Sequence, residues 1–236
     1  MGNITCEIAP HGDIRSGVLV KDFGISRDVP VRKSKTALLF VDMQNYTADK
    51  TGGEYSHLSS KELDEKYGYF FNELQTKVLP NLVRLQAMCR KVRIEVLYTV
   101  IESLTQDGRE MGLDYKISGL FCPKGSPDAK VLAELSPIGD EMVIPKTSSS
   151  PFISTNIDYV LRNLGVRHLI VCGILTEQCI DSTVRDACDY GYLVTLVIDA
   201  CATHDDERHR RSLFNNRGYC RQVTTDQLIN ELATLV

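Results

Sequence analysis

The sequence contains no apolar run long enough to span a membrane as a helix. Its longest apolar stretches, TALLFV and HLIVCGIL, fall well short of the roughly 18 residues that such a helix requires. The first residues, MGNITCEIAPHGD, include acids and lack the basic start and apolar centre of a secretory signal. The sequence therefore predicts a cytoplasmic protein with no membrane partner.

Clustered charge of either sign is also missing. The 27 basic and 31 acidic residues give a net charge of −4 and are dispersed along the chain. Nucleic-acid-binding proteins gather Lys and Arg on one surface, so we expect no nucleic-acid partner. The motifs GxGxxG and GxxxxGK[ST] follow none of the predicted strands, which disfavours a nucleotide-binding protein.

Closely spaced cysteine motifs are absent, although the chain has eight cysteines. Their spacings are wide and irregular, with no CxxC pair and no Cys/His run of zinc-like spacing. A chain of 236 residues buries a sizeable core without disulfides. We therefore expect reduced thiols, most of which pack as small apolar side chains.

Apolar and amphipathic segments alternate from Thr36 to the end of the sequence. Continuous apolar runs, typical of strands buried on both faces, occupy residues 36–42, 94–100, 141–146, 167–173 and 193–200. Helical spacing of apolar residues occupies 67–92, 154–165, 177–191, 206–216 and 224–235. This alternation predicts right-handed βαβ units, hence an α/β fold whose mostly parallel sheet is covered on both faces. Residues 1–35 are expected to be an N-terminal extension of one domain at 36–236.

Three chemically active side chains stand at or just after predicted strand ends. Asp42 closes the first strand, Lys146 closes the third, and Cys179 follows the fourth. Ligands of parallel α/β sheets bind beyond the carboxyl ends of the strands, so an acid, a base and a nucleophile are positioned to converge there. Taken singly, Asp42 also fits a turn carboxylate, Lys146 a solvated lysine, and Cys179 a packing residue.

The position of Cys179 favours an ionised thiol. If Thr176 caps the following helix, Cys179 is the third helical residue, where free N–H groups and the helix dipole stabilise an anion. A nearby Lys146 ammonium would lower the pKa of the thiol further. We therefore expect Cys179 to be a thiolate, unlike Cys172 and Cys188.

Three motifs that contain these residues resemble the isochorismatase-like cysteine hydrolase family. They are LLFVDMQN with Asp42, IPKTSSSPFISTNIDYVLRNLG with Lys146, and VCGILTEQCIDSTVRDACDYGYLVTLVIDACAT with Cys179. The likeness extends over about residues 36–203. It implies a Rossmann-like three-layer α/β/α sandwich of about six strands, and a homo-oligomer that is a dimer or a tetramer.

The same resemblance implies a catalytic triad and its surroundings. Asp42 is expected to accept the thiol proton of Cys179, and Lys146 to stabilise the thiolate. A cis peptide bond is expected between Ile174 and Leu175. The backbone N–H groups of Leu175 and Cys179 are then expected to form an oxyanion hole.

The resemblance implies hydrolysis of a small-molecule substrate through an acyl-thioester intermediate. Dedicated isochorismatases of the family do not require the cysteine, so its presence favours cleavage of a C–N bond in a small amide, ureido or N-carbamoyl compound. The segments QNYT and VIESL resemble pocket segments of ureido-type amidohydrolases, which makes Asn45, Tyr46 and Glu102 candidate substrate contacts. Tyr115 is a further group that could meet a substrate carboxylate. The alternatives are isochorismate hydrolysis that releases pyruvate, and a catalytically silent binding module.

A bound metal is not expected. Nicotinamidases that resemble this family carry an Asp-x-His pattern and further histidines after the first two strands, whereas the segment YTVIESLTQDG has no histidine. His57, His168, His204 and His209 are scattered, and each is typical of an isolated surface histidine. The sequence therefore predicts neither a metal nor another cofactor.

Overall fold

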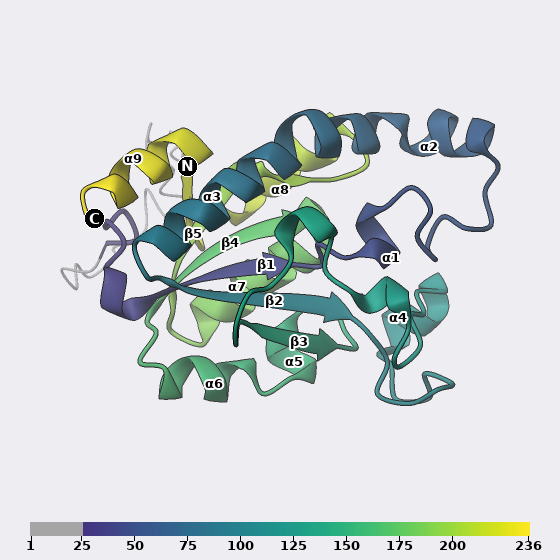
Figure 1. Cartoon of the computed structure of the whole chain (residues 1–236), viewed down its shortest axis with the longest axis horizontal. Helices are drawn as coiled ribbons and strands as arrows, with labels where there is room; N and C mark the ends of the chain where they lie inside the picture. Colours follow the sequence, from purple (N-terminus) through teal and green to yellow (C-terminus); the bar gives the residue numbers. More distant parts are fainter. Residues whose placement is uncertain (1–25) are drawn as a thin grey trace, which may run out of the picture.

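The computed structural model describes residues 26–236, so most of the predicted extension at 1–35 lies outside the described residues. A six-stranded sheet forms its centre, with the order β3-β2-β1-β4-β5-β6 and every neighbouring pair parallel (Figure 1). The strands are β1 (Thr36–Val41), β2 (Glu95–Ile101), β3 (Met142–Lys146), β4 (His168–Ile174), β5 (Leu193–Ala202) and β6 (Arg221–Val223). The predicted α/β fold with a parallel sheet is confirmed. Only β6 escaped prediction, because so short a strand produces no recognisable pattern.

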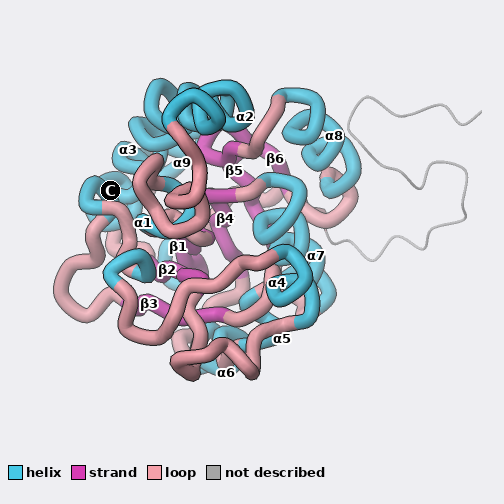
Figure 2. Tube along the Cα trace, turned by 90° about the vertical axis from the view of Figure 1, so that its right-hand side faces the viewer, coloured by secondary structure: helices cyan, strands magenta, loops and turns pink. Residues whose placement is uncertain are grey.

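Helices cover both faces of this sheet and complete three layers. The α-helices are α1 (Asn45–Ala48), α2 (Ser60–Glu73), α3 (Leu79–Lys91), α4 (Leu113–Ser118), α5 (Pro151–Ser154), α6 (Ile157–Asn163), α7 (Asp181–Asp189), α8 (Asp206–Asn216) and α9 (Thr225–Ala233). The other helical turns are η1 (Lys33–Lys35), η2 (Leu74–Val78), η3 (Pro127–Ala129), η4 (Ala133–Leu135) and η5 (Thr176–Ile180). Helices α2, α3 and α9 lie over one face, and α5, α6 and α7 over the other (Figure 1, Figure 2). No helix within residues 26–236 is long and apolar enough to cross a membrane.

The two central strands have the burial that their apolar runs predict. Every residue of β1 and of β4 is buried, as expected for parallel strands with helices on both faces. β1 pairs with β2 on one side and with β4 on the other. The carboxyl ends of these strands therefore meet in the middle of the sheet, where the site is built.

The long helical segment before β2 begins earlier than its apolar spacing predicts. Helix α2 starts after Ser59, whose side chain forms a capping box with Glu62, and the wider turn η2 joins it to α3. Pro80 lies in the first turn of α3, where a missing N–H is tolerated. The wide turn η2 thus lies directly before the start of α3, and the helical path continues to Lys91.

The segment from residue 102 to residue 140, which carries no predicted helix or strand, contains a second small core. Helix α4 lies within this segment and ends at Gly119, whose φ of 74° suits glycine. The core residues are Tyr46, Ile101, Met111, Tyr115, Cys122 and Ala129. Their spacing follows neither a helical nor a strand period, which explains why the sequence did not reveal them. This second core fixes the segment over the carboxyl end of the sheet.

Gly173 allows β4 to pass unusually close to β1. Its φ is 124°, and a Cβ atom at this position would lie 2.2 Å from the carbonyl oxygen of Val41. Only glycine tolerates this combination of backbone angle and close approach. Because of this close approach, the residues that follow β4 lie directly beside Asp42.

Candidate active site

The carboxyl ends of β1, β3 and β4 bring Asp42, Lys146 and Cys179 together. Asp42 follows β1, Lys146 is the last residue of β3, and Cys179 lies in the turn η5 that follows β4. Lys146 Nζ lies 2.9 Å from Asp42 Oδ2 and 3.4 Å from Cys179 Sγ. The structure therefore places the three predicted residues within bonding reach of one another, and their catalytic roles stay predictions.

Asp42 is held in an uncommon backbone conformation. Its φ is 58°, in the left-handed region, which non-glycine residues adopt rarely and aspartate more readily than most. Its carbonyl oxygen accepts a hydrogen bond from Thr47 Oγ1 at 2.7 Å, and its Oδ1 accepts one from Thr99 Oγ1 at 3.3 Å. These contacts turn the chain out of β1 and point the carboxyl group at Lys146.

Lys146 is completely buried, which is rare for lysine and requires that its charge be matched. Besides its contacts with Asp42 and Cys179, Nζ donates to Tyr115 Oη at 2.6 Å and to the Ser148 carbonyl oxygen at 2.9 Å. Burial acts to lower the pKa of Lys146, but the neighbouring Asp42 and Cys179 outweigh it, and the pKa is raised. The side chain is therefore an ammonium ion at neutral pH.

The prediction that Cys179 ionises readily is wrong for the resting site. Burial raises the pKa of the Cys179 thiol to about 12, although the Lys146 charge acts to lower it. The predicted cap is also wrong: Leu175 is the cap residue, and Thr176 Oγ1 instead pairs with His209 Nδ1 at 2.9 Å. Loss of hydration of the buried sulfur outweighs the help of an ammonium that Asp42 already neutralises.

The carboxyl group of Asp42 and the thiol share one proton beside one ammonium ion. Burial raises the pKa of Asp42 as well, and the charge and hydrogen bond of Lys146 oppose this shift without reversing it. Two anions next to one cation would leave an uncompensated buried charge, which is costly. The arrangement therefore permits the thiol proton to move to Asp42 during the reaction, which creates a thiolate while the net charge stays zero.

Tyr115 is a member of this cluster whose position the sequence did not reveal. Its hydroxyl group accepts from Lys146 Nζ and lies 3.6 Å from Cys179 Sγ, and its ring is buried. It is carried to the site by α4, which was not predicted. The expectation that Tyr115 meets a substrate carboxylate is not supported, because its hydroxyl is already engaged by Lys146.

We expect Tyr115→Phe to lower kcat/KM about tenfold. The change removes an acceptor from a buried ammonium ion and a partner from the thiol, and hydrogen bonds to charged groups contribute roughly 1.5–3 kcal/mol. The measurement is the pH profile of kcat/KM, which shifts if Tyr115 stabilises the charged cluster. Tyr159→Phe, on the exposed surface of α6, is the matched control. An unaltered rate and profile in Tyr115→Phe would remove this residue from the site.

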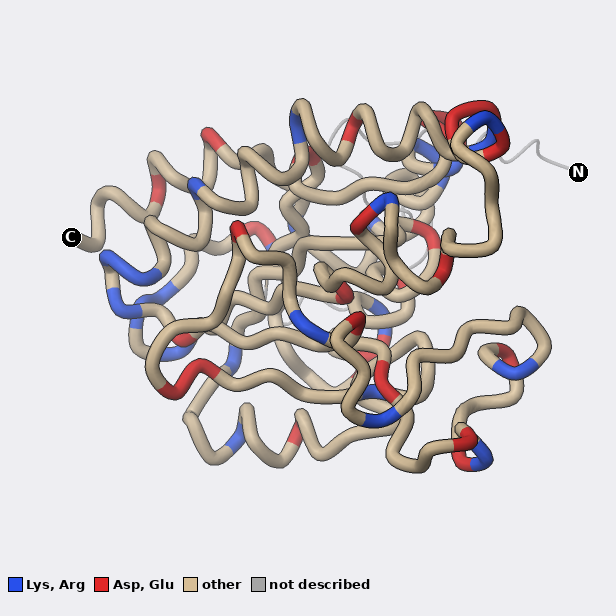
Figure 3. The backbone as a smooth tube through the Cα atoms, turned by 45° about the vertical axis from the view of Figure 1, so that its right-hand side comes forward, with Lys and Arg blue, Asp and Glu red and all other residues tan. Residues whose placement is uncertain are grey.

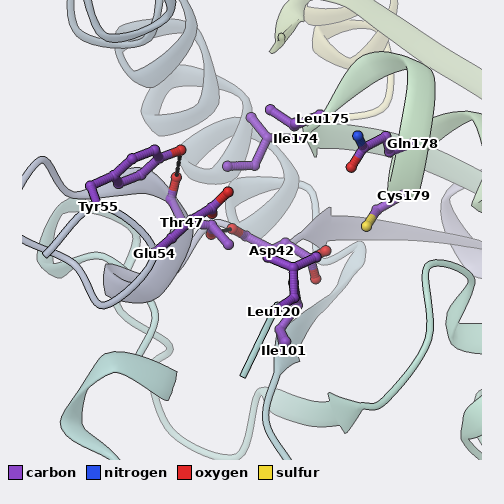
Figure 4. A pocket seen from close by; sticks show the side chains of 10 residues that line it. All are labelled: Asp42, Thr47, Glu54, Tyr55, Ile101, Leu120, Ile174, Leu175, Gln178 and Cys179. Carbon is purple, nitrogen blue, oxygen red and sulfur yellow. Dashed lines mark hydrogen bonds between the residues drawn. The ribbon is translucent and has the colours of Figure 1, made fainter. Parts of the chain in front are cut away.

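A pocket that is partly open to solvent gives access to the sulfur (Figure 4). Its lining residues are Asp42, Thr47, Glu54, Tyr55, Ile101, Leu120, Ile174, Leu175, Gln178 and Cys179. The peptide bond between Ile174 and Leu175 is cis, and both residues line the pocket beside Cys179.

Asn45, Tyr46 and Glu102, the predicted substrate contacts, do not line this pocket. Asn45 Nδ2 donates to the Pro127 carbonyl oxygen at 3.3 Å, and Tyr46 Oη accepts from the Phe121 N–H at 2.9 Å. Glu102 Oε1 accepts from the Gly125 N–H at 2.7 Å and borders a separate hollow. These side chains hold the segment 102–130 in place instead.

The wall opposite Cys179 is formed by residues that the sequence analysis missed. Thr47, Glu54 and Tyr55 come from α1 and from the irregular loop after it, where no periodic pattern marks a position as lining a cavity. The pair Gly52 and Gly53 was the one available signal of a tightly folded loop.

Within residues 26–236, no group of three His, Cys, Asp or Glu side chains is placed to hold a metal ion. His168 is buried in β4, and its Nε2 pairs with Thr195 Oγ1 at 2.8 Å, so the expectation of a surface histidine is wrong there. His209 pairs with Thr176 as described above. The expected absence of a metal cofactor stays a prediction.

The sequence and the fold both resemble known proteins. The family model described as "Isochorismatase domain" matches residues 36–227. Ureidoacrylate amidohydrolase RutB of Variovorax paradoxus is 39% identical over 90 residues, which span 38% of this chain and only 35% of the length of that protein. Ureidoacrylate amidohydrolase RutB of Agrobacterium fabrum is 28% identical over 188 residues, covering 73% of this chain and 78% of that protein.

Among solved structures, a cysteine hydrolase from Pseudomonas syringae pv. phaseolicola matches with a TM-score of 0.75. It is 24% identical in sequence, and the match covers 88% of this chain and 97% of that chain. This likeness establishes the shared fold.

Proposed function

Since the chain belongs to the isochorismatase family, we propose that it hydrolyses a C–N bond of a small amide, ureido or N-carbamoyl compound, with Cys179 as the nucleophile. The observation that carries this proposal is the convergence of Cys179, Lys146 and Asp42 at a small pocket. A buried lysine that contacts both a carboxylate and a thiol has no role in simple packing, because burying it costs hydration.

The first half of the reaction begins when the thiol proton moves to Asp42. Sγ then attacks the carbonyl carbon of the substrate, and the carbonyl oxygen becomes a tetrahedral oxyanion. The N–H groups of Leu175 and Cys179 are proposed to bind that oxyanion; loss of one such donor typically costs about 3–4 kcal/mol of barrier. The C–N bond breaks as Asp42 returns the proton to the leaving nitrogen, which leaves an acyl-thioester.

In the second half, Asp42 takes a proton from a water molecule that attacks the thioester. The C–S bond breaks, and the proton on Asp42 returns to the sulfur, so the thiol is restored. Lys146 keeps its positive charge throughout and compensates whichever neighbour is negative. This mechanism uses no cofactor.

A homo-oligomer is proposed on the family resemblance together with an exposed apolar surface. Leu113 and Ile117 on α4 and Ile153 on α5 are each at least 70% exposed. Exposed apolar side chains near one another are typical of subunit contacts. The number of subunits, two or four, stays a prediction.

The function is tested by a substrate screen with the native protein and Cys179→Ala. Ammonia release is measured from ureidoacrylate, N-carbamoyl acids, biuret and nicotinamide, and pyruvate release from isochorismate. Cys179-dependent ammonia release from at least one compound is the expected result. Pyruvate from isochorismate alone would favour vinyl-ether hydrolysis, and no turnover of any compound would favour a silent binding module.

A further inference from the structure

The pocket beside Cys179 contains two acids and no base. Among the described residues that line it, Asp42 and Glu54 are acidic, and none is Lys, Arg or His. The nearby Lys146 does not line the pocket, and its Nζ already contacts Asp42, Tyr115, Ser148 and Cys179. A substrate carboxylate would therefore meet negative charge without a cation to pair with.

Glu54 is the polar group of this wall that has no partner within residues 26–236. Figure 4 shows it with Thr47 and Tyr55 on the side of the pocket away from Cys179. Tyr55 Oη donates to the Thr47 carbonyl oxygen at 3.2 Å, and the Thr47 hydroxyl donates to the Asp42 carbonyl oxygen. The half-buried Glu54 carboxyl group, by contrast, makes no hydrogen bond or ion pair with any described side chain or backbone group. It is free to contact a ligand.

We propose that Glu54 determines specificity: the pocket accepts amides or ureas whose remote end is neutral or, preferably, carries an ammonium group, and it rejects those that end in a carboxylate. The inference rests on the proposed C–N hydrolysis by Cys179 and narrows its substrate class. Like-charge contacts in a partly enclosed site weaken binding strongly, whereas an opposite charge strengthens it. A neutral ligand can still donate a hydrogen bond to the Glu54 oxygens.

The preference is expected to depend on pH near neutrality. Burial raises the pKa of Glu54 to about 7, and the neighbouring negative charge of Asp42 acts in the same direction. The other titratable groups around it are Tyr46 and Tyr55, whose pKa values burial raises, and Asp128, which accepts from the Gly53 N–H. Glu54 therefore gains its charge between about pH 6 and 8 while the tyrosines stay neutral.

Three amides of matched length separate the charge effect from the chemistry: 4-aminobutanamide, pentanamide and glutaramate. The corresponding ureas, 3-aminopropylurea, butylurea and 4-ureidobutanoate, serve if simple amides are not hydrolysed. We expect kcat/KM for the ammonium compound to exceed that for the carboxylate compound about 100-fold at pH 8. The ratio is expected to fall toward pH 6, because Glu54 becomes protonated and loses its charge. The ammonium group of the ligand, with a pKa near the roughly 10.4 of lysine, stays charged over this range and does not contribute to the change.

Glu54→Gln tests the residue itself. The variant keeps the size of the side chain and removes its charge, so the preference for the ammonium compound is expected to shrink about tenfold or more and to lose its pH dependence. Glu65→Gln, which makes the same change on the exposed surface of α2, is expected to behave as the native protein. Thermal denaturation of all variants verifies that they are folded.

The outcomes separate this inference from the proposed function. If no compound of either series or of the substrate screen is hydrolysed in a Cys179-dependent manner, the proposed function fails and the inference with it. If compounds of the screen are hydrolysed but none of either series is, only the inference fails. If hydrolysis depends on Cys179 but the carboxylate compounds are preferred, only the inference fails. An equal preference in Glu54→Gln and the native protein likewise removes Glu54 as the selecting group.

Discussion

Lys146→Met is expected to lower the free energy of unfolding by about 3–5 kcal/mol, because it leaves the Asp42 carboxylate buried without its partner. Lys146 is fully buried and Asp42 is 1% exposed, so water cannot replace the lost ammonium. Loss of the ammonium raises the pKa of the buried Asp42 carboxyl group further, so Asp42 tends to take up a proton in the folded state. The loss of stability is therefore expected to be larger at pH 8 than at pH 5, as urea denaturation at both values would measure.

The double variant Asp42→Asn, Lys146→Met isolates the cause. Both charges are removed, and such neutral replacements of buried ion pairs are often close to neutral in stability. We expect the double variant to recover most of the lost stability and to remain inactive. Lys77→Met, which removes a lysine from an exposed i,i+4 pair with Glu73, is the surface control and is expected to change stability by about 0.5 kcal/mol or less. Losses that simply add in the double variant would show that the two charges are independent.

The positions of Asp42, Lys146 and Cys179 were predictable because they follow from strand ends. An apolar run that stops at Asp42, another that stops at Lys146, and a third that leads to Cys179 required only the parallel topology to bring them to one edge of the sheet. A strand end is a strong signal, since a change of periodicity marks it in the sequence.

The ionisation of the thiol was not predictable from the same residues. Proximity to a helix start and a lysine suggested a lowered pKa, but the balance depends on how completely the sulfur is buried and whether the lysine is already paired. Both are properties of the packed structure. The sequence indicates which groups are near one another, and the degree of burial decides which protonation state prevails.

The pocket wall was missed for a different reason. Asn45 and Tyr46 stand one turn or less from Thr47, and in a four-residue helix neighbouring positions point in different directions. Thr47 consequently faces the pocket, while Asn45 and Tyr46 hold the segment opposite. The family resemblance pointed to the segment QNYT, which does contain a pocket residue. Which of its side chains faces the pocket depends on the backbone geometry, which the sequence does not reveal.

Cys179→Ala is expected to reduce kcat at least about 10⁴-fold, the size of loss that follows removal of a nucleophile from a catalytic triad. Stability should change little, because alanine removes one atom from a side chain at the edge of a pocket. Cys89→Ala, in the core of α3, is the matched control: it removes the same atom, loses a modest amount of stability, and keeps full activity. Substantial turnover by Cys179→Ala would end the case for covalent catalysis.

The resting protonation of Cys179 makes a separate prediction for its reactivity. A thiol with a pKa of about 12 is protonated at neutral pH. As long as the pH stays below the pKa, each increase of one pH unit raises the thiolate fraction tenfold. Alkylation of Cys179 by iodoacetamide, followed by site-resolved mass spectrometry, should therefore be slow at pH 7 and about tenfold faster at pH 8. Rapid labelling that is constant from pH 6 upward would mean that the thiolate exists before substrate binds. The expected pH dependence instead assigns ionisation to the moment when the proton moves to Asp42 and sulfur attacks.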